Sequence, residues 1–293
     1  MNLKGKVVVV TGVANPRGIG LALATAYALN GAKIVLADIS AEGAESSAEK
    51  LRGQGAECIA VPVNMSVISE VRELADSAYE SFGRVDLLFL NHASMAPLLG
   101  HSLLAPEVDS WDNQIDVNLK GVIYGIKSFL PRMMASGNES YISATVSGAG
   151  INGLMYGNAP YAVSKVAITA VMESLYGQLR DADSAVRCGV IVPGFVATMA
   201  TDDIAKQGQA MLNAHGFPAS IRTSAQLAEF TMAAIERGDF WAHPSLEEDQ
   251  RLTGGEHQDQ IKWVNEIYQK KADALKTRSN PDSYLWGPPS LGT

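Results

Sequence analysis

A buried strand, a glycine-rich turn and a helix follow one another at the start of this chain, and this order constrains the fold more than any other feature. Residues 6–11 are mostly β-branched, which is typical of a strand buried on both faces of a parallel sheet. The turn contains Gly12, Gly18 and Gly20, and an apolar helical run covers residues 21–30. Glycines let the backbone approach a phosphate, and a helix N-terminus presents unpaired N–H groups. The turn is therefore expected to bind a dinucleotide pyrophosphate, with an ordinary tight turn as the alternative.

Strands and helices alternate along most of the remaining chain. Further strands are expected at residues 33–37, 59–63, 85–90, 141–146, 187–192 and 238–242. Helices are expected at residues 41–53, 67–82 and 107–135, after Pro160, and at residues 224–237 with Ser224 as the cap. This alternation predicts an α/β fold with a doubly wound, Rossmann-like parallel sheet and helices on both faces. We predict one domain over residues 1–245, a substrate lid near residues 199–216, and a C-terminal extension over residues 246–293.

Charge and composition exclude several classes of partner. The net charge is -8 and no block of Lys and Arg occurs, which argues against nucleic acid or an anionic membrane as partner. No apolar run reaches membrane-spanning length, and no signal peptide is expected because the N-terminus runs directly into an expected strand. Cys58 and Cys188 are interpreted as reduced core thiols, and the histidines show no ligand-like pairing. A cytoplasmic protein without a metal site is expected.

Polar residues at the carboxyl ends of the expected strands are candidates for cofactor contacts. Asp38 ends the second strand, where a carboxylate can bind both hydroxyls of an adenosine ribose and repel a 2′-phosphate. Arg17 argues the other way because it could attract that phosphate, but the repulsion by Asp38 is expected to decide in favour of NAD. The same edge of the sheet is expected to hold Asn64, Met65, Asn91 and Ala93. His92 is interpreted as a structural residue.

Tyr161 and Lys165 lie four residues apart in the helix that Pro160 opens, so they share one helical face. An ammonium beside a phenol is expected to lower the pKa of the phenol. Tyr161 would then be a general acid/base that works near neutral pH. Asn118 is a polar residue inside an apolar helical run and is expected to find hydrogen-bond partners there.

Together, these motifs resemble the short-chain dehydrogenase/reductase family and occur in the family's order. They are Thr11-Gly12, Gly18-Ile19-Gly20, Asp38, Asn91-x-Ala93, Asn118, Ser147-x-Ala149-Gly150, Tyr161-x-x-Ser164-Lys165 and Pro193-Gly194-x-Val196-x-Thr198. The resemblance covers residues 4–198 motif by motif, and more loosely extends to residue 243.

The resemblance implies a catalytic set of four residues. Tyr161 would take the proton of an alcohol, and Ser147 would hold the substrate oxygen. Lys165 would lower the pKa of the tyrosine and bind the nicotinamide ribose, while Asn118 would hold a water that relays protons. The implied cofactor contacts are Gly12, Arg17, Gly18, Ile19, Gly20, Asp38, Asn64, Met65, Asn91, Ala93, Tyr161, Lys165, Pro193, Gly194, Val196 and Thr198.

The sequence departs from the family pattern in several places. The turn is lengthened within residues 13–17, and the sequence of these residues is similar to that of enoyl-thioester reductases. Asn64 replaces the usual Asp, and residues 91–94 differ from the usual Asn-Asn-Ala-Gly. Ser147 lies one residue farther from the tyrosine than is commonest, which leaves Ser143 as the alternative.

The function expected from the resemblance is NAD-dependent interconversion of a secondary alcohol and a ketone, on a bulky hydrophobic or aromatic small molecule. The alternatives are an NAD(P)H-dependent carbon–carbon double-bond reductase and a non-catalytic dinucleotide-binding protein. The resemblance also implies a homotetramer or homodimer.

Overall fold

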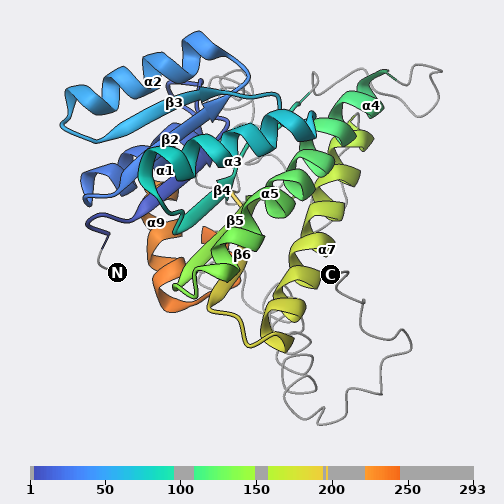
Figure 1. Ribbon diagram of the computed structural model, residues 1–293. Coiled ribbons are helices and arrows are strands. Elements are labelled where there is room, and N and C mark those ends of the chain that lie inside the picture. The colour runs from blue at the N-terminus through green and yellow to red at the C-terminus, as the bar shows by residue number, and fades with distance from the viewer. Residues whose placement is uncertain (1–2, 96–108, 149–157, 194–195, 197–221, 245–293) are drawn as a thin grey trace, which may run out of the picture. The chain divides into compact units, whose positions relative to one another are not determined.

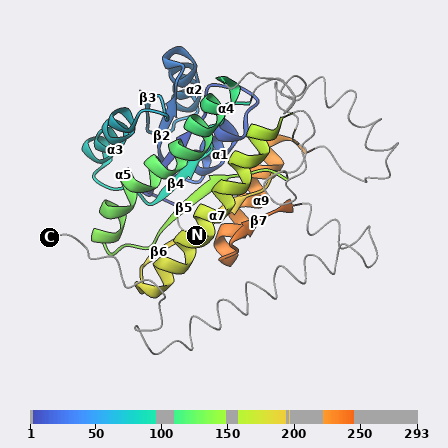
Figure 2. The ribbon, with the colours of Figure 1, turned by 90° about the vertical axis from the view of Figure 1, so that its right-hand side faces the viewer.

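A computed structural model describes residues 3–95, 109–148, 158–193, 196 and 222–244 (Figures 1 and 2). All of these residues belong to one compact unit, Met1–Ser245. The expected lid at residues 199–216 and the expected extension at residues 246–293 lie outside the described residues, and both stay predictions.

The described residues form a parallel, seven-stranded sheet with the strand order β3-β2-β1-β4-β5-β6-β7, which confirms the expected fold class. The strands are β1 (Val7–Thr11), β2 (Lys33–Asp38), β3 (Cys58–Pro62), β4 (Leu87–Leu90), β5 (Ser140–Thr145), β6 (Val186–Ile191) and β7 (Trp241–Ala242). The fourth strand begins two residues later than expected. Asp86 precedes it and accepts hydrogen bonds from the Lys6 ammonium and the Val7 amide.

Helices cover both faces of this sheet, and successive strand residues alternate between the two faces. One face carries α3 (Ile68–Phe82), α5 (Gly121–Ala135) and α7 (Ala159–Asp181), and the other carries α1 (Ile19–Leu29), α2 (Ala41–Gly53) and α9 (Ser224–Arg237) (Figure 1). In β1, Val7 and Val9 pack into the first core, whereas Val8 and Val10 pack into the second. Burial on both faces explains why the strands are continuous apolar runs rather than alternating ones.

The strand order reverses beside β1, which lies between β2 and β4. Ligands of doubly wound sheets bind in the crevice outside the carboxyl ends of the strands at such a reversal. The carboxyl ends here are Thr11, Asp38, Leu90 and Thr145, so the candidate residues after these strands share one edge of the sheet.

The helix expected at residues 107–135 is continuous from Asp109 to Ala135, but it contains a π-helical segment. This segment, η1 (Ile115–Lys120), lies between α4 (Asp109–Gln114) and α5. The amide of Gly121 bonds to the carbonyl of Asp116, five residues back, which is the π pattern. Such widened turns are frequent at functional sites, and this one contains the fully buried Asn118.

The cap of α9 differs from the expected one by one residue. Thr223, not Ser224, is the N-cap, and it forms a reciprocal capping box with Gln226. Ser224 begins the helix, and its hydroxyl donates to the carbonyl of Arg17 at 2.6 Å. The prediction missed this because both residues are good caps and the choice depends on a distant carbonyl.

Gly20 offers a direct test of the close packing between β1 and α1. A Cβ at this position would lie 2.2 Å from the carbonyl oxygen of Gly12, a backbone atom that cannot move aside easily. We expect Gly20→Ala to destabilise the protein by about 2 kcal/mol or more, as overpacked sites do. The control is Gly53→Ala in α2, where a Cβ meets nothing within 4 Å and should be neutral or slightly stabilising. Urea unfolding measures both changes, and equal stabilities of the two variants would contradict the packing.

Candidate functional site

The glycine turn is held in place from two directions. Gly12 has a φ of +74°, which favours glycine, and a Cβ there would lie 2.8 Å from the Cα of His92. Within the lengthened part of the turn, the Ala14 amide donates to Asp38 Oδ2 at 2.9 Å, and the Ser47 hydroxyl donates to the Val13 carbonyl at 2.9 Å. The additional residues are therefore fixed against β2 and α2.

Asp38 ends β2 with a half-buried carboxylate that still has capacity to accept hydrogen bonds. Its Oδ2 accepts from Ala14, and its Oδ1 accepts from the Ser40 amide at 3.0 Å. A carboxylate has about four acceptor positions, so those not used here can serve two hydroxyl groups of a ligand.

The structure brings Asp38 together with several other candidate residues around one cavity of about 280 Å³. The expected contacts that line it are Gly12, Asp38, Asn64, Met65 and Ala93, with His92 and Val117 beside them. The residues present fit a dinucleotide in two respects. The turn has no room for a Cβ at either Gly12 or Gly20, and the carboxylate lies where a ribose hydroxyl would be bound.

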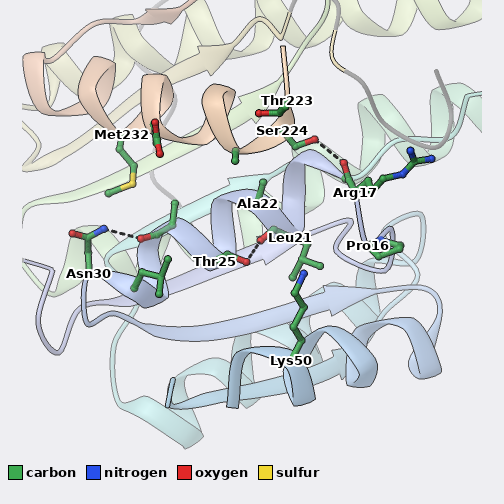
Figure 3. A pocket seen from close by; sticks show the side chains of 15 residues that line it. Pro16, Arg17, Leu21, Ala22, Thr25, Asn30, Lys50, Thr223, Ser224 and Met232 are labelled. Atoms are coloured by element: carbon green, nitrogen blue, oxygen red, sulfur yellow. Dashed lines mark hydrogen bonds between the residues drawn. The ribbon is translucent and has the colours of Figure 1, made fainter. Parts of the chain in front are cut away.

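Arg17 and Gly18 line a different cavity, a groove of about 580 Å³ between α1 and α9 (Figure 3). Lys50 of α2 lines the same groove, together with apolar residues such as Leu21 and Met232. Asp38 is not among its lining residues. Arg17, which favoured NADP, and Asp38, which favoured NAD, thus line separate cavities.

Asn91 and His92 connect the end of β4 to the end of β1. The Asn91 side-chain amide donates to the carbonyls of Thr11 and Gly12, both at 3.3 Å. His92 Nδ1 lies 2.7 Å from Thr11 Oγ1, and the ring is buried. Burial lowers the pKa of His92 to about 3, and the charge of Lys165 acts in the same direction. The imidazole is therefore neutral, in agreement with a structural interpretation.

The side chain of Asn118 makes three hydrogen bonds within the protein. Its Oδ1 accepts from the Ser94 amide at 2.7 Å, and its Nδ2 donates to the Ser94 carbonyl at 3.0 Å. Nδ2 also donates to Ser164 Oγ at 3.1 Å, and that hydroxyl donates to the Tyr161 carbonyl at 2.7 Å. Asn118 thereby joins the segment after β4 to the first turn of α7.

Tyr161 and Lys165 share one face of α7, as expected. Lys165 is 1% exposed, and its Nζ lies 5.5 Å from the centre of the Tyr161 ring. Nζ donates to the main-chain carbonyl of Thr145 at 2.8 Å. Burial of the ammonium lowers the pKa of Lys165 to about 8.

The pKa of Tyr161 differs from the expected direction. Burial raises it, and a hydrogen bond with the Ser147 side chain opposes this rise. Lys165 does not reverse the balance, since its Nζ faces the ring and is bonded to Thr145 instead of the phenol oxygen. Ser147, preferred over Ser143 from the sequence, is thus the serine that meets the tyrosine.

Sequence reasoning missed the residues that hold the start of α7. Asn158 is the N-cap, and its Oδ1 accepts from the Tyr161 amide at 3.3 Å. Gln114, buried at the end of α4, donates to the same oxygen at 3.2 Å. The Asn before Ala-Pro was a recognisable cap signal, but nothing local indicated its contact with a glutamine from another helix.

The remaining candidates are only partly covered by the structure. Pro193 and Val196 are both buried, and Val196 forms an isolated bridge with Arg222. Gly194 and Thr198 lie outside the described residues. Within the described ranges, no group of three or more metal-binding side chains occurs. None of the helices in those ranges combines the length and the apolar character that crossing a membrane requires.

The sheet topology and the polar edge define a Rossmann-like fold with a nucleotide-binding crevice. A profile of the short chain dehydrogenases matches residues 6–209, and the chain therefore belongs to this family of oxidoreductases. It is 33% identical over 72% of its length to an uncharacterized oxidoreductase of Listeria innocua, of which the match covers 84%. It is 35% identical over 69% of its length to the 1-deoxy-11-beta-hydroxypentalenate dehydrogenase of Streptomyces avermitilis, of which the match covers 72%.

Solved structures agree on the fold and differ in the cofactor. A short chain dehydrogenase/reductase from Burkholderia phymatum in complex with NAD has a TM-score of 0.73 and 29% identity, covering 86% of this chain and 96% of that one. A short chain dehydrogenase from Burkholderia cenocepacia in complex with NADP has a TM-score of 0.72, covering 83% and 96%. Because the sequence identity is 23%, the similarity to this structure supports the fold alone. These two neighbours therefore do not distinguish NAD from NADP as the cofactor of this chain.

The buried Lys165 predicts a pH dependence of stability. Its pKa is about 8 in the folded protein against 10.5 when exposed, so the unfolded chain binds more protons between these values and stability rises with pH. Relative to Lys165→Met, the wild type should gain roughly 3 kcal/mol of unfolding free energy across this window. Urea unfolding at a series of pH values measures the difference. The exposed Lys50 gives the matched control, Lys50→Met, and a pH-independent difference for Lys165→Met would contradict the burial of a charged ammonium.

Proposed function

We propose that this chain is an NAD-dependent oxidoreductase that interconverts a secondary alcohol and a ketone, with Tyr161 as the acid/base. The observation that carries the proposal is the buried Lys165 beneath Tyr161, whose phenol is hydrogen-bonded to Ser147. A cation, a phenol and a hydroxyl gathered at the carboxyl edge of a doubly wound sheet support proton exchange with a carbinol oxygen.

Each of these residues has a separate role in the proposed chemistry. The hydroxyl of Ser147 and the phenol of Tyr161 are hydrogen-bonded to each other and are therefore close enough to bind the same substrate oxygen. Tyr161 gives that oxygen a proton in ketone reduction and removes it in alcohol oxidation. A bound nicotinamide would donate or accept the hydride.

Asn118 is proposed to hold the water that relays protons to Lys165. Because both N–H donors of the Asn118 side chain are already used by Ser94 and Ser164, we propose that main-chain groups of η1 take part in holding a relay water beside Lys165. The widened turn of the π segment is a place where such groups are available to a water.

The preference for NAD rests on Asp38. A carboxylate at this edge of the cavity would face a 2′-phosphate with like charge in a partly buried site, which is unfavourable. Arg17 lines the groove between α1 and α9 and is not among the residues that line the cavity of Asp38, which weakens its case as a phosphate partner.

The proposed substrate is a bulky hydrophobic or aromatic secondary alcohol or its ketone. The Streptomyces relative is named as the dehydrogenase of a hydroxypentalenate, which supports an alcohol as the electron donor. We also propose a homotetramer or homodimer as the assembly, which light scattering after size exclusion would check.

The cofactor proposal is tested by titrating NADH and NADPH into the wild type, Asp38→Ala and Arg17→Ala. We expect tight NADH and at least tenfold weaker NADPH for the wild type, with the gap narrowed in Asp38→Ala because the repulsion is removed. Arg17→Ala is the matched control and should leave the ratio unchanged. Tight NADPH in the wild type, lost in Arg17→Ala, would overturn the proposal and favour reduction of ketones or enones.

The proposed acid/base is tested with Tyr161→Phe on a panel of secondary alcohols and ketones. Removing the phenol oxygen should lower kcat by at least a hundredfold, the scale of general acid/base catalysis, while NADH affinity changes little. Full turnover by this variant would exclude the mechanism. Cofactor binding with no wild-type turnover on any member of the panel would favour a non-catalytic protein.

The raised pKa of Tyr161 predicts opposite pH trends for the two directions of reaction. Alcohol oxidation needs the phenolate, so its kcat should rise as the pH increases through the alkaline range. Ketone reduction needs the phenol and should decline over the same range. Steady-state rates in both directions check this, and a flat profile for oxidation would argue against Tyr161 as the base.

A further inference from the structure

Three hydrogen bonds connect the buried ammonium of Lys165 to the glycine turn, and Thr145 is in the middle of this chain. Lys165 Nζ donates to the Thr145 carbonyl at 2.8 Å. The Thr145 hydroxyl donates to Asn91 Oδ1 at 2.9 Å. The Asn91 side-chain amide then donates to the Gly12 carbonyl at 3.3 Å.

The hydroxyl of Thr145 and the carbonyls of Thr11 and Gly12 together determine which way the Asn91 amide faces. The carbonyls of Thr11 and Gly12 only accept hydrogen bonds, so the amide nitrogen must face them. The amide oxygen then points to Thr145, whose hydroxyl supplies a donor. Without that donor, the oxygen would lose its partner in a part-buried site, and a rotated amide would place it against two carbonyl oxygens.

The orientation of Asn91 matters to the turn because the amide fills the space between two glycines. A Cβ added to Gly20 would lie 2.7 Å from Asn91 Nδ2, so this nitrogen packs directly against the N-terminus of α1. The same nitrogen bonds to Gly12 at the other end of the turn. A change at Asn91 therefore reaches both glycines.

The main-chain carbonyl of Thr145 also takes part in this chain of hydrogen bonds, because it accepts from Lys165. Lys165 is 1% exposed, and a buried ammonium needs a partner that is itself held still. Thr145 is 7% exposed and is the last residue of β5, where regular pairing with β6 ends. Its side-chain bond to Asn91 fixes the strand end whose carbonyl accepts from Lys165.

We propose that the Thr145 hydroxyl is a positioning group that couples the place of Lys165 to the conformation of the glycine turn, and thereby supports dinucleotide binding. The inference rests on the proposed function for its effect on the cofactor. The coupling between the two ends of the site stands on the hydrogen bonds alone.

The test compares Thr145→Val, which has nearly the same shape without the hydroxyl, with Thr145→Ser, which keeps the hydroxyl. NADH affinity is measured by fluorescence titration, and amide hydrogen exchange is followed for residues 10–20 and for the rest of the sheet. We expect Thr145→Val to bind NADH about tenfold more weakly, the factor for one lost buried hydrogen bond. Exchange in residues 10–20 should be faster in this variant, and Thr145→Ser should stay within about twofold of the wild type in both measurements.

Three results would overturn the proposal. The first is wild-type binding and exchange in Thr145→Val. The second is equal loss in both variants, which would assign the effect to the methyl group. The third is faster exchange across the whole sheet, which would indicate a general loss of stability. If the wild type binds neither NADH nor NADPH, the proposed function fails, and the exchange of residues 10–20 still decides the coupling.

Discussion

The arrangement of the site depends on burying the ammonium of Lys165. Taking a charge out of water is costly, and the lowered pKa of this lysine reflects that cost. The fold tolerates it because the carbonyl of Thr145 is aimed at Nζ from the end of β5 and the aromatic ring of Tyr161 lies above. The cation is thus held next to the Tyr161 ring at the carboxyl end of β5. The stability given up at this position is therefore consistent with a functional site.

A sheet covered on both faces leaves its carboxyl edge as the place where polar groups can gather. The strand interiors are mostly apolar on both sides, and hydrogen-bonding side chains such as Thr11, Asn91 and Thr145 occur where strands end. These side chains satisfy one another across neighbouring strands instead of facing water. These hydrogen bonds link the ends of β1, β4 and β5 beside the glycine turn, while the buried His92 Nε2 next to them has no hydrogen-bond partner among the described residues.

The lengthened glycine turn shows how a local departure from a family pattern is accommodated. Its additional residues are not loose, because Ala14 bonds to Asp38 and Val13 accepts from Ser47. Asp38 consequently has a structural role as well as the proposed role in cofactor choice. The two roles are compatible because a carboxylate accepts more hydrogen bonds than the turn uses.

The sequence by itself determined the fold class, the family and most of the candidate residues. Apolar runs of strand length separated by helical periodicity require a doubly covered parallel sheet, and ordered motifs such as Tyr161-x-x-x-Lys165 mark its edge. Most helix and strand bounds follow from the same local patterns. These features could be predicted because they depend on residues close together in the chain.

Only the tertiary structure decided which polar atoms meet. Arg17 and Asp38 line separate cavities in the structure. The side chain of Asn118 accepts a hydrogen bond from the Ser94 amide, and the carbonyl of Thr145 accepts one from Lys165. The tertiary structure also widened one turn of the helix around Asn118 into a π segment, which has no signature in a 3.6-residue period. The physical reason is that a hydrogen bond forms only when two groups, often far apart in sequence, are placed to within tenths of an ångström of the right distance. Periodicity and motif spacing carry no information at that scale.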